Sequence, residues 1–403
     1  MLLLQSPRLV DSPLPDILPH TAGFDPAGDL DGFLRQVPAR WVVYLMADAD
    51  DRPVQLLCVR NLRASLKRRL GGDEQVGPSR RVDYRQLVRR VRWARVDSAF
   101  EADVVYYEAA RLAFPATYGG MVGFRPAWFV HVDPDANFPR FTKTIDLTGR
   151  AGRYIGPVED KHTAARLIEL AEDAFDLCRY YNVLVQAPRA SACAYKQMHK
   201  CPAPCDGSVS MGHYRHMVGW AADTLVDPKP MVDEQTRRMH AAAQALRFES
   251  AGKIKAFVAQ LSQLGKGPFR HVARLADFRY LALQHGPRDG QAKAFVVTPG
   301  RIDQVLGLVG PQDEPGDALR HVLRVATRAE DDNPLDQTGA ERVGVVAAHL
   351  FTAKATHGAF LRLSDIDERS FAKAYKDLQR QRKPAEPAGD EEGEGVMKEL
   401  QAI

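Results

Sequence analysis

Four of the five cysteines fall within a 28-residue stretch, at positions that could bind a metal: Cys178, Cys193, Cys201 and Cys205. Four thiolates can complete the tetrahedral shell of Zn²⁺ or hold an iron–sulfur cluster. Two prolines stiffen the turn between the last two cysteines and reduce the entropy lost on ligation. The alternative is that these residues are small buried apolar side chains, but their clustering favours ligands. Thiolate number and spacing leave iron and zinc both open.

Composition sets the broad class of the chain. Its 403 residues, 45% apolar and 26% charged, are typical of a soluble globular protein with two or three domains. Lys plus Arg exceed Asp plus Glu only by 55 against 51, so the net charge names no polyanionic partner. Basic residues concentrate in the first quarter, and the candidate phosphate contacts are Arg60, Arg63, Arg68, Arg69, Arg89, Arg90 and Arg92. The alternative is a charged face that is merely solvated.

No stretch of the sequence indicates membrane insertion. The opening MLLLQSPRLV has no basic segment before its apolar residues, and no later run approaches the roughly 18 apolar residues that a membrane span needs. We therefore expect a cytoplasmic protein without a membrane partner. In a reducing compartment, clustered thiols bind metal more often than they form disulfides.

Hydrophobic periodicity predicts the elements that position these residues. Residues 41–47 and 54–59 have strand patterns and form an expected hairpin, whereas 61–70 and 98–114 have helical spacing. A helix from about 160 leads to Cys178, and residues 233–264 predict an antiparallel helical hairpin. Later segments alternate between strand and helix patterns. The predicted fold class is therefore α/β of the mixed α+β kind.

These elements suggest six divisions of the chain. They are an irregular arm (1–37), a small mixed-sheet domain (38–148), a cysteine-rich helical region (149–230), a helical hairpin (231–267), a small α/β unit (268–380) and an acidic disordered tail (381–403).

The cysteine region resembles the central segment of the UvrC family of excision-repair proteins. The resemblance lies in GRYIGPVEDKHTAARLIELAEDAFDLC (152–178), ACAYKQMHKCPAPCDG and HYRHMVGWAADTL, which follow in the family's order. It implies that the four cysteines bind an iron–sulfur cluster, with Zn²⁺ as the alternative. It covers the front half of that family only, because the RNase H-like and helix-hairpin-helix domains are not recognisable after Leu264.

The helical hairpin is similar to the UVR motif, through which UvrC pairs with UvrB. Residues 239–257, MHAAAQALRFESAGKIKAF, carry the match, and Ile254-Lys255-Ala256 depart from the usual Leu-Arg-Asp. A two-helix element is too small to bury both faces, so it invites a partner. The implied partner-binding residues are Met239, Ala242, Ala243, Leu246, Phe248, Glu249, Ala251 and Ile254. Packing on its own protein is the alternative.

Residues 42–141 resemble a GIY-YIG nuclease domain in the order of their elements. The family's catalytic residues are mostly replaced: the first tyrosine is kept as Tyr44, whereas Gln55, Cys58, Ser65 and Tyr106 stand at the other positions. A glutamine cannot act as the general base, and a tyrosine cannot replace a carboxylate as a ligand of Mg²⁺. We therefore expect the nuclease to be inactive, with Mg²⁺ needed only if it is active.

Taken together, the resemblance implies a nucleotide-excision-repair protein linked to the SOS response, which binds DNA and UvrB. One alternative is an active endonuclease in which Glu101 or Glu108 acts with Tyr44. Another is an iron–sulfur redox sensor that binds nucleic acid. Whether the chain is an enzyme is left open by its sequence.

Overall fold

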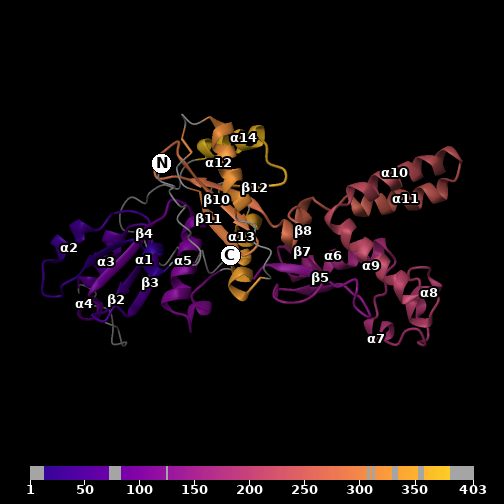
Figure 1. Cartoon of the computed structure of the whole chain (residues 1–403), viewed down its shortest axis with the longest axis horizontal. Helices are drawn as coiled ribbons and strands as arrows, with labels where there is room; N and C mark the ends of the chain where they lie inside the picture. Colours follow the sequence, from indigo (N-terminus) through magenta and orange to yellow (C-terminus); the bar gives the residue numbers. More distant parts are fainter. Residues whose placement is uncertain are drawn as a thin grey trace. The chain divides into compact units, whose positions relative to one another are not determined.

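The computed structural model of the chain describes residues 13–71, 83–123, 126–305, 309–310, 314–328, 335–352 and 358–381. They form two compact units. The first consists of Met1–Arg125, Arg279–Asp332 and Gly344–Ile403, and the second of Pro126–Phe278 and Asn333–Val343. Among the described residues, the first unit combines helices with two antiparallel sheets, and the second combines helices with one (Figure 1). The predicted α+β class is confirmed. None of the helices in these ranges is long and apolar enough to cross a membrane.

The front part of the first unit is a four-stranded antiparallel sheet. Its order is β1-β4-β2-β3, with β1 His20–Gly23, β2 Val42–Ala47, β3 Pro53–Val59 and β4 Arg90–Arg95. All six residues of β2 are buried because the strand lies inside the sheet and both of its faces are covered. The predicted hairpin β2–β3 is confirmed, with an irregularity between Met46 and Ala47.

Helices cover both faces of this sheet. α2 (Leu30–Gln36), α3 (Leu62–Leu70) and α4 (Tyr84–Leu87) lie on the face of Tyr44, and α1 (Leu14–Ile17), α5 (Ala99–Ala113) and the 3₁₀ turn η1 (Tyr118–Gly120) lie on the other. Both long helices start at side-chain caps. Asn61 accepts from the Ala64 N–H, and Ser98 accepts from the Glu101 N–H, each at 3.1 Å.

The first residues differ from the irregular arm that we expected at 1–37. Residues 13–37 contain two helices and β1, which pairs with β4, while the residues before 13 lie outside the described ranges. Leu18, Phe24 and Val37 are buried in the two cores. Proline, aspartate and glycine here begin and end short elements, which a compositional argument cannot distinguish from an arm.

The first unit also contains the C-terminal α/β part that we expected. Its sheet has the order β11-β10-β9-β12. The strands are β9 Tyr280–His285, β10 Ala292–Thr298, β11 Arg301–Gln304 and β12 Ala359–Arg362. The helices are α12 Pro315–Arg328, α14 Glu368–Arg380 and the part of α13 (Gln337–Phe351) from Gly344 onward. Phe100 of α5 packs edge-on against Phe295 and Phe360 of this sheet. The acidic tail predicted at 381–403 lies outside the described residues after Gln381.

The second unit holds the cysteine region and the helical hairpin. Its sheet has the order β6-β5-β7-β8, formed by β5 Trp128–Val132, β6 Thr142–Thr144, β7 Arg153–Val158 and β8 Ala273–Arg274. The expected boundary at 148 therefore falls inside this sheet, because β5 pairs with both β6 and β7. The helices are α6 Lys161–Ala174, α7 Tyr181–Leu184, α8 Ala194–Gln197, α9 Met211–Val226, α10 Lys229–Gln244 and α11 Phe248–Leu261, with 3₁₀ turns η2 Pro204–Asp206, η3 Gly267–Phe269 and η4 Leu275–Asp277.

Candidate functional site

Three of the four clustered cysteines lie close together in the second unit. Cys178 follows α6, and Cys201 and Cys205 flank the start of η2, where Ala203 has a φ of 56°. The thiols of Cys178 and Cys201 are close enough to shift each other's pKa, and Cys205 is near enough to act on both electrostatically. The Cys178 thiol also donates to the carbonyl of Tyr180 at 3.7 Å. Cys193 precedes α8, and no interaction joins it to the other three among the described contacts.

Neighbouring groups hold the three thiols in place. The backbone N–H of Cys178 donates to the hydroxyl of Tyr214 at 3.1 Å, and Tyr214 is buried in α9. The hydrogen bond with Cys201, together with burial, raises the pKa of the Cys178 thiol, and the same bond lowers the pKa of Cys201 to about 7. The donated proton therefore stays on Cys178, and Cys201 is the member of this pair that ionises first.

The four cysteines have the right chemistry to bind a soft metal, but their side chains are not arranged around one point. Thiolates are the preferred ligands of zinc and of iron–sulfur clusters. Within the ranges that the structure describes, however, no group of three or more His, Cys, Asp or Glu side chains is arranged to hold a metal ion. The predicted ligand set is thus partly assembled, and binding would require Cys193 to join the other three.

Three positions of the expected nuclease site meet on one face of the front sheet. The Tyr44 hydroxyl and the Ser65 hydroxyl are 2.8 Å apart, and both side chains are buried. Arg69 donates to the Gln55 side chain at 3.2 Å and also contacts the Tyr44 hydroxyl. Burial raises the pKa of Tyr44. The hydroxyl that would position water is therefore enclosed between Ser65 and Arg69.

The two remaining positions lie on the opposite face. Cys58 accepts a hydrogen bond from the indole of Trp41 at 3.2 Å, and burial raises its pKa to about 12. Tyr106 packs in the same core, and burial raises its pKa to about 12 as well. The sheet therefore separates these groups from Tyr44, so the five positions do not form one site.

The alternative catalytic carboxylates are both paired within the first unit. Glu101 accepts from Lys293 at 2.6 Å and from the Asp97 N–H at 2.8 Å, and Lys293 also bonds Asp97 at 2.7 Å. The pKa of Lys293 is raised overall: burial acts to lower it, but the attraction of the carboxylates of Glu101 and Asp97 is the stronger effect. Glu108 is 1% exposed and pairs with Arg111 at 2.9 Å.

The candidate phosphate contacts differ in how free they are. Arg90 and Arg92 both bind Asp51 of the β2–β3 turn, at 2.8 Å and 3.0 Å. Other guanidinium groups are engaged too: Arg60 covers the Trp41 ring, Arg63 donates to Val37, Arg69 to Gln55, and Arg89 to Gln86 and Val88. Arg68 lies exposed on α3. Except for those of Arg89, these partners come from other segments, so the sequence pattern could not indicate them.

The hairpin α10–α11 exposes its apolar tip. Leu246 and Phe248 are 74% and 66% exposed, and Leu246 has a φ of 58° in the connection. Met239, Ala242, Ala243 and Ile254 are half-buried, whereas Ala251 is buried. Glu249 is exposed and pairs with Lys253 at 2.8 Å. The predicted partner-binding residues therefore divide into an inner set and an exposed tip.

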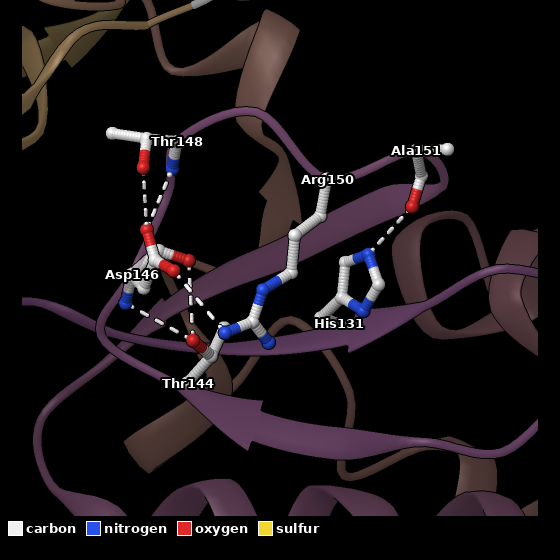
Figure 2. Close-up of polar contacts among 6 residues, drawn as sticks. All are labelled: His131, Thr144, Asp146, Thr148, Arg150 and Ala151. Carbon is white, nitrogen blue, oxygen red and sulfur yellow. Dashed lines mark hydrogen bonds and ion pairs between the residues drawn. The ribbon is translucent and has the colours of Figure 1, made fainter.

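Figure 2 shows the polar loop that joins β6 to β7 in the second unit. Asp146 accepts from the Thr148 N–H and hydroxyl at 3.0 Å and 2.7 Å, and from Arg150 at 3.1 Å. Hydrogen bonds from Thr148 lower the pKa of Asp146. The His131 imidazole contacts the Ala151 carbonyl at 2.8 Å. These polar groups are used inside the loop, so the loop fixes the strand connection.

A protein-family model matches the first part of the second unit. Residues 127–224, which contain β5 to α8, most of α9 and all four clustered cysteines, match the family model described as the UvrC/Cho excinuclease middle domain. No solved structure matches the chain with significance.

The chain is also similar to UvrABC system protein C from several bacteria. It is 29% identical to that of Campylobacter jejuni subsp. doylei over 45% of this chain and 29% of the relative. It is 25% identical to that of Geobacter sp. (strain M21) over 62% of this chain and 40% of the relative. The predicted resemblance to the front half of UvrC is confirmed, and the chain spans well under half the length of these relatives.

Proposed function

We propose that this protein is an excision-repair factor of the UvrC kind, which binds DNA and UvrB and does not cut DNA with its front domain. The match of residues 127–224 to the UvrC/Cho middle domain carries the proposal, because that segment includes the whole cysteine cluster. The surroundings of Tyr44, the exposed tip of the hairpin and the neighbouring thiols of the cysteine region support its other parts.

An inactive front domain is supported by the surroundings of Tyr44. Hydrolysis of a phosphodiester needs an accessible group to position water, a cation at the phosphate and a carboxylate for the metal. Tyr44 is 0% exposed and bonded to Ser65, while Glu101 and Glu108 are held by Lys293 and Arg111. None of these three groups is free to take up the required role.

We expect no nicking of a lesion-bearing duplex by the purified protein with UvrB, in Mg²⁺ or in Mn²⁺. Gel analysis of end-labelled strands measures this. Cleavage that is lost in Tyr44→Phe but retained in Tyr280→Phe, which alters a buried tyrosine of β9, would show that the front domain is an active nuclease. Both variants must give unchanged circular dichroism, because each loses one buried hydrogen bond of about 1 kcal/mol.

UvrB binding is supported by the exposed tip of the hairpin. Leu246 and Phe248 present apolar side chains to solvent at the end of two helices whose inner residues already contact each other. Large apolar side chains that remain exposed beside a half-buried stripe are typical of docking surfaces. A matching hairpin of UvrB would cover them.

Phe248→Asp is expected to weaken binding of purified UvrB by about thirtyfold or more, because a central aromatic anchor contributes about 2 kcal/mol or more. Isothermal titration calorimetry measures the affinity. Gln260→Asp, which adds the same charge at an exposed position of α11 away from the tip, is the matched control and should bind normally. Equal affinity of the two variants would contradict the assignment of the tip to UvrB.

The cysteine cluster is proposed to hold an iron–sulfur cluster, with Zn²⁺ as the alternative. The closeness of Cys178 and Cys201 supports it, with Cys205 near enough to act on both thiols electrostatically, and Cys193 precedes α8 between them in the sequence. A bound cluster would cross-link the end of α6 to the loops around α8 and η2, so metal binding would also stabilise this part of the fold.

A further inference from the structure

Exposed tyrosines and cations lie together beside the cysteine cluster. Tyr180 and Tyr181, at the start of α7, are 47% and 38% exposed. The guanidinium of Arg140 lies 3.9 Å from the centre of the Tyr181 ring, and the Tyr180 ring is 5.7 Å from that of Tyr195. We call these four residues the aromatic face. α7 and α8, which carry its tyrosines, lie at the end of the second unit opposite its sheet (Figure 1).

The aromatic face is held by the surrounding structure. Arg215 of α9 donates to the carbonyls of Ala136 and Asn137 at 2.9 Å and 3.3 Å, which fixes the loop that carries Arg140. Leu184, the last residue of α7, is fully buried. Rings that are already positioned lose little conformational entropy when a planar ligand stacks on them.

The charge of this segment is unusually one-sided. Residues 178–205 include Arg179, Arg189, Lys196 and Lys200 but no Asp or Glu. Arg179 and Lys196 pair with Asp173 and Asp206, whereas Arg140 and Arg189 make no ion pair with a carboxylate in the described ranges. Positive charge is therefore available beside the tyrosine rings.

Packing does not account for these rings. The structural tyrosines, Tyr44, Tyr107 and Tyr214, are all less than 2% exposed. Tyr180 and Tyr181 stand in solvent with a guanidinium stacked on one ring. Aromatic rings with adjacent arginines are the pattern that binds unpaired nucleic acid bases, which stack on the rings while the cations hold phosphates.

We infer that the aromatic face binds unpaired bases in DNA, at a locally opened stretch of duplex. This inference rests on the proposed DNA-binding function and assigns it a second contact, distinct from phosphate contacts in the front domain such as Arg68. Because stacking is tolerant of base identity, the face would recognise an open structure and not a sequence.

The test uses fluorescence anisotropy with the full chain, on a duplex with a central unpaired bubble and on a fully paired duplex of equal length. Tyr181→Ala is expected to weaken bubble binding by about five- to a hundredfold, the range for loss of one stacked base, and to leave paired-duplex binding unchanged. Tyr181→Phe keeps the ring and should bind the bubble normally. Unchanged thermal unfolding of both variants shows that the face remains folded.

A phosphate-contact variant serves as the comparison, and each contrary result below rejects a different part of the proposal. Arg68→Ala should weaken binding to both duplexes alike, as a phosphate contact does. If the unmodified protein binds neither duplex, the proposed DNA binding fails as well. If the unmodified protein binds both duplexes and Tyr181→Ala binds the bubble with the same affinity, only the assignment of the aromatic face is rejected. If Tyr181→Ala binds DNA normally but no longer binds UvrB, the aromatic face contacts a protein partner and the inference is overturned.

Discussion

Protein purified without oxygen is expected to show a broad visible absorption band and bound iron, and Cys201→Ser is expected to lose both. Cys201 lies beside Cys178, which lowers the pKa of the Cys201 thiol to about 7, and the substitution removes one of the four proposed ligands. Changes next to a metal site already cost about ten- to a hundredfold in affinity, and loss of a ligand costs at least as much. Absorbance and metal analysis of the same samples measure this.

Cys58→Ser is the matched control, because Cys58 is the one cysteine outside the cluster and lies in the first unit. It should keep the full iron content. A chelator should lower the melting temperature of the unmodified protein but not that of Cys201→Ser. A colourless protein with one zinc would overturn the iron–sulfur proposal and leave the four-thiolate site, and a protein without either metal would overturn both.

Lys293→Met is expected to destabilise the first unit by about 3–5 kcal/mol, because an uncompensated buried charge is costly. Lys293 is the shared partner of Glu101 and Asp97, and the side chains of Lys293 and Glu101 are only 12% and 5% exposed. Removing the ammonium group leaves two carboxylates in a site that water barely reaches. Urea titration with hydrogen exchange of α5 and β10 as the readout measures the change in this unit alone.

Lys253→Met removes an exposed ion pair with Glu249 and should leave the urea midpoint unchanged. The double change Lys293→Met with Glu101→Gln should recover part of the loss, because one buried charge is then removed as well. A midpoint for Lys293→Met equal to that of the unmodified protein would show that the carboxylates are not held by Lys293.

Local patterns predicted the elements well where apolar periodicity was strong. The hairpin β2–β3, helices α3, α5 and α6, and the pair α10–α11 all formed close to the expected positions. Their caps at Asn61 and Ser98 are also local signals. The pairing of β1 with β4 could not be predicted in this way, because it joins His20–Gly23 to a strand that is distant in sequence, Arg90–Arg95.

In the candidate site too, features set by neighbouring residues were predicted, whereas contacts between distant segments were not. The cysteine spacing pointed to a ligand set, but the sequence did not indicate that Arg90 and Arg92 share Asp51, or that Lys293 reaches Glu101. The exposed tyrosines were also missed. The Tyr180-Tyr181 pair soon after a cysteine was a visible signal, but Arg140, which completes the face, is distant in sequence.

The bond between Lys293 and Glu101 spans 192 residues. During synthesis, Glu101 is therefore made long before its partner, and the complete second-unit segment 126–278 is translated in the interval. Until then, the carboxylate of Glu101 has no ammonium partner and the ring of Phe100 is uncovered. The long loop that must close delays the burial of both side chains. This sequence of events favours aggregation or chaperone capture of incomplete chains. The first unit can complete its fold only after the segment from Gly344 onward is released, because Phe360 of that segment also packs on Phe100.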